Sequence, residues 1–157
     1  MTYTLSIDLE TNELYEALSA EIREALGRLE EVNTVPAGTQ LISQHVAPQH
    51  VIILNQGSVE ISVPAGGRSI SVALAGNGKV FGLRSAVSGE LPEINVICLE
   101  RCIVTLLPKD EFLQILKQYP QIYFAIAKVL SADLQRAQGL LRDMPRVAHG
   151  ASRRIKG

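Results

Sequence analysis

The sequence predicts a mainly β fold, an antiparallel jelly roll or barrel (a double-stranded β-helix) with flanking helices. Three observations lead to this prediction. Between residues 33 and 108, short runs rich in Val and Ile alternate with turn residues at near-regular intervals. An apolar helical stripe precedes them within residues 9–31, and helical patterns fill residues 109–144. A basic tail follows at residues 145–157. We expect the whole chain, residues 1–157, to form a single domain.

Length and composition are those of a soluble globular protein. The chain has 157 residues, a hydrophobic fraction of 46%, a charged fraction of 20% and a net charge of −1. This length allows one domain with a substantial core, and this charge gives no overall attraction to nucleic acid. The N-terminus has neither the basic region nor the apolar run of a signal peptide, and no apolar stretch is long enough to cross a bilayer. We therefore expect a cytoplasmic protein without membrane contact.

The lead-in segment, residues 9–31, reads as helix in two pieces. Ser19 can cap the second piece, because a serine side chain accepts a hydrogen bond from a first-turn N–H group. Apolar residues at helical spacing form one stripe: Leu14, Leu18, Ile22, Leu26 and Leu29. We expect this stripe to dock on the barrel.

Turn residues divide the central segment into strands. Gly57, residues 64–67 and residues 76–78 mark three of these turns. Residues 35–39 form another turn with a strand on either side. The remaining predicted strands are 40–43, 51–55, 58–63, 69–75, 80–81, 94–99 and 103–107.

Two helices are expected after the barrel. Lys109 to Gln118 forms a short one, and Pro120 begins a long one that runs to Met144. Along the long helix, residues separated alternately by four and three positions form an apolar seam: Tyr123, Ala127, Leu130, Leu134, Ala137, Leu141 and Met144. This is the a/d spacing with which two helices pair, so we expect a parallel homodimer. Ile122, Ile126 and Val129 lie to one side of the seam and should face the barrel.

The stretch from Gly76 to Ile97 is the most informative about function. Gly82 turns the chain into a short helical pattern, and a helix start leaves backbone N–H groups free to receive an anion. With Phe81-Gly82 here and a Gly57 hairpin at residues 55–61, the sequence resembles the cyclic-nucleotide-binding domain of the cAMP receptor protein/FNR-type regulators. The resemblance covers about residues 19–144. It implies a ligand pocket formed by Phe81, Gly82, Leu83, Arg84, Ser85, Glu93, Ile94 and Asn95.

The resemblance also implies that this chain has lost the usual cyclic-nucleotide contacts. The family's ribose-binding Glu corresponds to Leu83, and its phosphate-binding Arg corresponds to Glu93. An isobutyl group cannot accept the ribose hydroxyl, which leaves it unpaired at a cost of about 1–3 kcal/mol. A carboxylate repels the phosphate. The base-reading positions fall near Ala137 and Gln138, which offer no hydroxyl. Another small anionic ligand stays open, because Arg84 and the backbone donors remain.

We therefore expect a dimeric regulatory sensor module that does not bind cAMP or cGMP by the usual contacts. One alternative is the sensor half of a transcription regulator. The dozen residues after the long helix are too few for a helix-turn-helix, so DNA binding by this chain alone is not expected.

A second alternative is a cupin-like metal or small-molecule enzyme. It has little support, because His45, His50 and His149 are scattered and no nucleophile motif is present. Cys98 and Cys102 are more simply buried small residues than metal ligands. We expect no metal, no cofactor and no catalytic residue.

Overall fold

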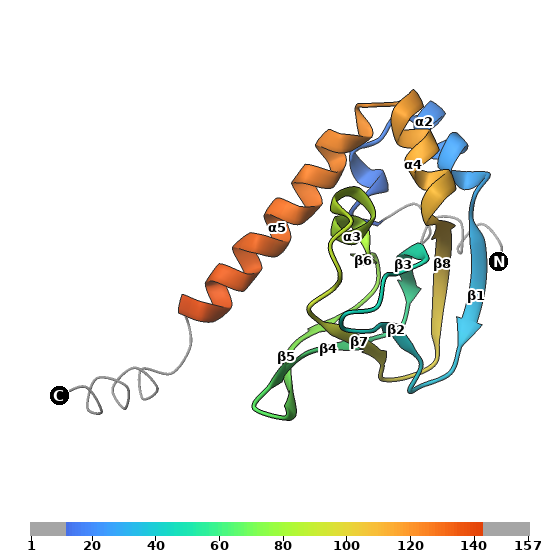
Figure 1. Cartoon of the computed structure of the whole chain (residues 1–157). Coiled ribbons are helices and arrows are strands. Elements are labelled where there is room, and N and C mark those ends of the chain that lie inside the picture. The colour runs from blue at the N-terminus through green and yellow to red at the C-terminus, as the bar shows by residue number, and fades with distance from the viewer. Residues whose placement is uncertain (1–11, 143–157) are drawn as a thin grey trace.

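The computed structural model describes residues 12–142 (Figure 1). Within this range, eight strands form two four-stranded antiparallel sheets. The strands are β1 Glu31–Val35, β2 Gln40–Ile42, β3 His50–Gln56, β4 Val59–Ala65, β5 Arg68–Ala75, β6 Val80–Phe81, β7 Asn95–Cys98 and β8 Cys102–Pro108. The helices are a 3-10 turn at Tyr15–Ala17, α2 Ala20–Gly27, α3 Leu83–Ser88, α4 Lys109–Gln118 and α5 Ile122–Arg142.

The two sheets confirm the predicted jelly roll. One has the strand order β1-β8-β3-β6 and the other β2-β7-β4-β5. Strands that follow one another in the sequence often belong to different sheets, as β7 and β8 do across the turn at residues 99–101. The observed strands match the predicted ones to within one or two residues at each end.

Strand β3 explains why the sheet that contains it needs a helical cover. Ile52 and Leu54 point into the barrel interior, where they join Phe81 and Val104 in one buried cluster. Val51 and Ile53 alternate with them and join a second cluster formed by the helices. Because successive side chains of a strand point to opposite faces, β3 is buried on both. The helices therefore exclude water from the outer face of this sheet.

The lead-in helix is shorter than the sequence predicts. Helix α2 ends at Gly27, and Glu31 already pairs with Leu106 as the first residue of β1. The predicted end at residue 31 is therefore wrong, because backbone pairing with β8 outweighs the local helical pattern there. The cap is confirmed, since the Ser19 hydroxyl accepts from the Ile22 N–H group at 3.4 Å. The apolar stripe is also confirmed: Leu14, Leu18, Ile22 and Leu26 are buried, and Leu29 packs against them.

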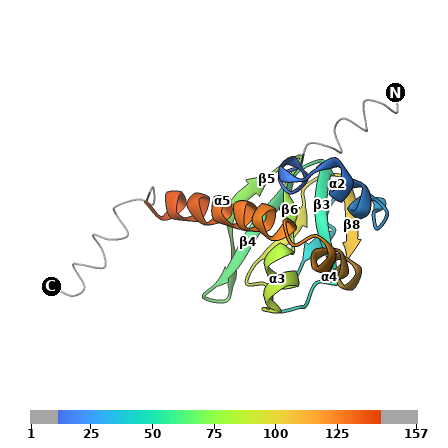
Figure 2. The same ribbon diagram turned by 90° about the horizontal axis from the view of Figure 1, so that it is seen from above.

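Helix α4 has the predicted bounds, and α5 begins two residues after the expected Pro120. Ile122, Ile126 and Val129 are buried against the rest of the domain, as predicted. Beyond them α5 extends outward past the barrel (Figures 1 and 2). No helix within residues 12–142 is both long enough and apolar enough to span a membrane.

The predicted seam of α5 is only partly covered by its own domain. Tyr123 is 49% exposed and Leu134 is 59% exposed, and Ala127 is exposed as well. Leu130 is instead half-buried and packs against the second buried cluster, the one that contains Val51 and Ile53, which we call the helix-side core. This seam residue therefore contacts its own domain. The side chains of Ala137 and Leu141, and all of Met144, lie outside the described residues.

Candidate ligand-binding site

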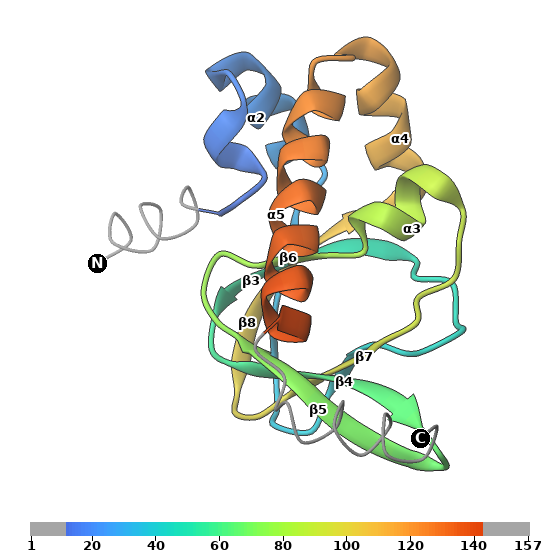
Figure 3. The same ribbon diagram turned by 90° about the vertical axis from the view of Figure 1, so that its left-hand side faces the viewer.

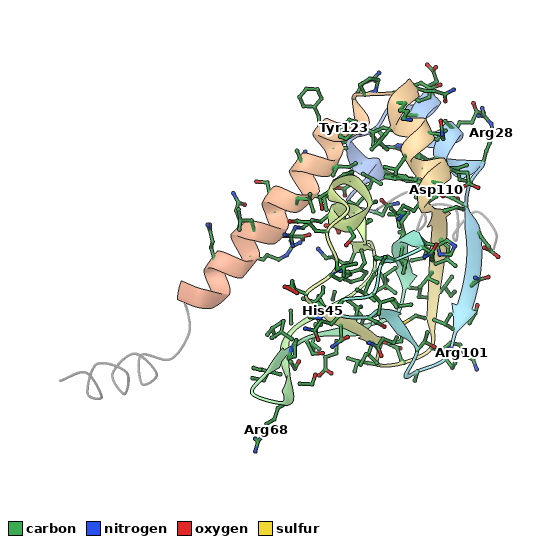
Figure 4. All side chains as sticks on the ribbon, in the orientation of Figure 1. Arg28, His45, Arg68, Arg101, Asp110 and Tyr123 are labelled. Carbon is green, nitrogen blue, oxygen red and sulfur yellow. The ribbon has the colours of Figure 1, made fainter. Side chains whose placement is uncertain are left out.

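An open cavity of about 1300 Å³ lies between the barrel and α5. Its walls come from β5, β6, the start of α3 and the turn of α5 around Leu134. Helix α5 passes in front of the barrel on this side (Figure 3). Figure 4 places Tyr123 near the start of α5 and Arg68 at the tip of the β4–β5 hairpin. The cavity is therefore bounded by strands of both sheets and by α5, whose buried residues Ile122, Ile126 and Val129 lie in its N-terminal half.

The sequence predicted most of one wall of this cavity. Seven of the eight predicted pocket residues line it: Phe81, Gly82, Leu83, Arg84, Ser85, Glu93 and Ile94. Asn95 is not among the residues that line it. The Asn95 side-chain oxygen instead accepts hydrogen bonds from the Gln40 side chain at 2.8 Å and from the Gln44 N–H group at 2.9 Å. Asn95 therefore ties β7 to the segment that follows β2.

Gly82 is required at the turn between β6 and α3 by two independent constraints. Its φ is +89°, a conformation that side chains other than glycine rarely adopt. A Cβ atom there would also lie 3.0 Å from the backbone oxygen of His50. Gly82 is the N-cap of α3, whose first-turn N–H groups have no acceptor within the helix. The glycine turn that the sequence indicates is therefore present.

Leu83 is the first residue of α3 and is almost completely buried. It is 2% exposed and belongs to the helix-side core together with Val51 and Ala86. Its isobutyl group offers no oxygen to a ligand hydroxyl, and replacing it with a polar residue would disrupt the core. The apolar side chain at this position therefore supports the packing of α3 on the barrel.

Glu93 lies at the edge of the cavity and faces a histidine. Its Oε1 atom is 2.9 Å from Nε2 of His45, and these side chains are 68% and 61% exposed. The backbone N–H of His45 donates to the oxygen of Pro92 at 2.8 Å, which fixes the two segments side by side. Such an exposed pair contributes about 0–1 kcal/mol. The position that the resemblance assigns to a phosphate-binding Arg therefore carries a carboxyl group paired with His45.

Arg84 is also paired. Its Nη2 atom donates to Oε1 of Glu90 at 2.8 Å, and the Arg84 side chain is 62% exposed. The sequence suggested Arg84 as the cation for an anionic ligand. In the structure its guanidinium is partnered on the surface, although the residue contributes to the cavity wall.

A second group of charges in the cavity was not predicted from the sequence. Glu13, Lys79, Asp133 and Arg136 all line it, and they come from the N-terminal segment, the residue before β6, and α5. We refer to these four residues as the charge cluster. No sequence spacing joins them, since 120 positions separate Glu13 from Asp133. Only the folded chain brings them together.

The cysteines lie away from the cavity walls. Cys98 ends β7 and Cys102 begins β8, both are buried, and they are not joined by a disulfide. Burial, together with the adjacent Cys102 thiol, raises the pKa of Cys98 to about 12. Both thiols thus behave as the buried small residues that the sequence indicates. Within residues 12–142, no group of three or more His, Cys, Asp or Glu side chains could hold a metal ion.

The family comparison agrees with this fold and cavity. The model of the family "Cyclic nucleotide-binding domain" matches residues 32–119, which is more than half of the chain. The chain therefore belongs to the cyclic nucleotide-binding domain family. No curated protein sequence gives a match.

Solved structures with a similar fold include several regulatory proteins. The Catabolite Activator Protein of Thermus thermophilus aligns with a TM-score of 0.71 and 20% identity, over 83% of this chain and 62% of that one. The regulatory subunit of a cAMP-independent protein kinase A from Trypanosoma brucei gives a TM-score of 0.70 and 16% identity, over 85% and 47%. The N-terminal domain of a Streptomyces coelicolor transcriptional regulator gives 0.65 and 18%, over 85% and 94%. The chain thus spans less than two thirds of the first two structures.

Proposed function

We propose that this protein is a dimeric regulatory sensor module that does not bind cAMP or cGMP through the usual contacts. The cavity between barrel and α5 supports the sensor role, and the exposed apolar residues of α5 support the dimer. The observation that carries the ligand claim is the state of Leu83 and Glu93. Leu83 is buried in the core and its side chain has no polar atom. Glu93 presents a carboxylate that pairs with His45.

The energetics disfavour a cyclic nucleotide. A ribose hydroxyl against Leu83 lacks its acceptor, which costs about 1–3 kcal/mol. A phosphate near Glu93 meets a like charge in place of a cation. The missing acceptor alone weakens binding by about 5- to 150-fold, since 1.4 kcal/mol corresponds to a factor of ten. The ligand we propose instead is a different small anion, and we propose no catalytic activity and a cytoplasmic location.

Calorimetry tests the ligand claim. We expect no saturable heat when cAMP or cGMP is titrated to micromolar concentrations into the purified chain. Glu93→Arg is the matched control, because Glu93 is largely exposed and the change only reverses its charge. This variant should bind cAMP more tightly than the wild type. Saturable micromolar binding by the wild type would refute the reading of Leu83 and Glu93.

A second candidate is the sensor half of a transcription regulator. It is supported by the similarity to the N-terminal domain of a transcriptional regulator and to a Catabolite Activator Protein. A gel shift with a protein expressed from the longest reading frame that contains this chain would test it. Retarded DNA would favour this candidate, and unretarded DNA would count against it.

A further inference from the structure

The charge cluster joins three segments at the cavity. Nζ of Lys79 pairs with the Asp133 carboxylate and lies 3.4 Å from Oε2 of Glu13. Arg136 pairs with the same oxygen of Asp133, and its Nη2 atom is 3.9 Å from Oε1 of Glu13. Two cations thus converge on one carboxylate oxygen. The Lys79 side chain is only 16% exposed, so losing these partners without a replacement would leave a largely buried ammonium group without a counter-charge, which is unfavourable.

The two carboxylates of the cluster are held differently. Oε2 of Glu13 also accepts from the backbone N–H of Val80 at 2.6 Å. The Glu13 backbone N–H donates to the Gly78 oxygen at 3.0 Å, so Glu13 is fixed to the turn before β6. The Asp133 carboxylate, by contrast, pairs with the side chains of Lys79 and Arg136. Asp133 is therefore the carboxylate that can leave without breaking a backbone hydrogen bond.

Counting charges shows what would replace Asp133. With Lys79 and Arg136 positive and Glu13 and Asp133 negative, the cluster is neutral. Without Asp133 its charge is +1, which one monoanion balances. A carboxylate fits best, because the cation pair already holds one. The nearby walls are apolar: Phe81, whose ring centroid is 5.9 Å from Nζ of Lys79, and Leu74, Leu130 and Leu134.

We propose that Lys79 and Arg136 bind the carboxylate of a small monocarboxylic acid with an apolar body, and that Asp133 occupies this pair until the acid displaces it. This inference rests on the proposed sensor function and specifies its ligand. Asp133 belongs to α5, so its displacement breaks the ion pairs that tie this part of α5 to Lys79. Ligand binding is thereby transmitted to the helix that carries the exposed apolar seam.

Binding measurements on the full chain test the carboxylate site. Hexanoate and benzoate are the probes, with 1-hexanol as the uncharged analogue and inorganic phosphate as an anion without an apolar body. We expect saturable heat with both carboxylates and weaker or no binding of hexanol and phosphate. Asp133→Asn should bind hexanoate at least tenfold more tightly, because the internal competitor is gone. Lys79→Met should abolish binding.

Two further variants control this test. Arg28→Met removes an exposed cation that pairs with Glu24 and does not line the cavity, and it should leave hexanoate affinity unchanged. Arg136→Met replaces Lys79→Met if the latter does not fold, because the Arg136 side chain is 57% exposed. Absence of carboxylate binding in both wild type and Asp133→Asn would overturn the proposal. Binding that survives loss of Lys79 and of Arg136 would also overturn it.

Hydrogen exchange tests the link to α5. We expect hexanoate to speed amide exchange at residues 130–136 of the wild type, whereas in Asp133→Asn exchange there is already fast and does not increase. Unchanged wild-type exchange at saturating hexanoate would refute displacement. Binding of cAMP is measured separately. Saturable heat on titration with cAMP would contradict the proposed function. The change in hexanoate affinity on substitution of Lys79 or Asp133 tests the carboxylate site independently of that result.

Discussion

We predict that Leu134→Glu prevents dimerisation of this protein. Leu134 lies in the predicted seam and is 59% exposed in the single chain. A glutamate can therefore point into water without disturbing the fold of one protomer. In a dimer built on the seam, the same side chain would be buried against the partner helix, where a charge is unfavourable.

The expected effect follows from this exposure. Complete burial of a leucine side chain is worth about 1.5–3 kcal/mol. Because 59% of it remains exposed, pairing can contribute about 1–2 kcal/mol per copy and about 2–4 kcal/mol per dimer. Losing this contribution weakens association by about 30- to 1,000-fold. Two glutamates facing each other add repulsion and desolvation to that loss.

Light scattering coupled to size exclusion measures the result. The wild type should have a mass of about twice 17.1 kDa, and Leu134→Glu should have the monomer mass. Phe124→Glu is the matched control. Phe124 is 81% exposed, more than Leu134, yet lies about 80° from it around the helix at about 100° per residue. A monomeric wild type, a dimeric Leu134→Glu variant, or a monomeric Phe124→Glu variant would refute the seam argument.

Two other predictions concern the barrel. Gly57 has a φ of +125°, and a Cβ there would lie 2.5 Å from Sγ of Cys102, so Gly57→Ala should lower the free energy of unfolding in urea by about 2–5 kcal/mol. Gly27→Ala, with no heavy atom within 4 Å, is its control and should change stability by less than about 1 kcal/mol; similar losses in both variants would contradict this. Because burial raises the pKa of Cys98 to about 12, its protonated form stabilises the fold, and this contribution should be lost as the pH rises from about 9 towards 12. A thiol reagent at pH 8 should therefore label Cys98 only after guanidinium unfolds the chain, and prompt labelling of the native protein would contradict the raised pKa.

The sequence alone determined much of the architecture, because the responsible signals are local. Glycine turns and alternating Val and Ile positions specify the strands. The stripe from Leu14 to Leu29 specifies the covering helix. Phe81-Gly82 specifies a turn that only glycine can make, and the spacing along the last helix predicts an apolar face. Each of these depends on short spacings between neighbouring residues of one segment, so no knowledge of the fold is needed to detect them.

Tertiary structure alone decided which side chains meet in the cavity. The sequence places Lys79 in a turn, Asp133 on a helix and Glu13 near the start of the chain, with no pattern that relates them. It also offered Asn95 as a pocket group and Arg84 as the cation for an anion. In the fold, Asn95 accepts hydrogen bonds from Gln40 and Gln44, and Arg84 lines the cavity but pairs with Glu90. Charge pairing depends on distances in space, and these are fixed only when the packing of α5 against the barrel brings distant segments within a few ångströms of each other.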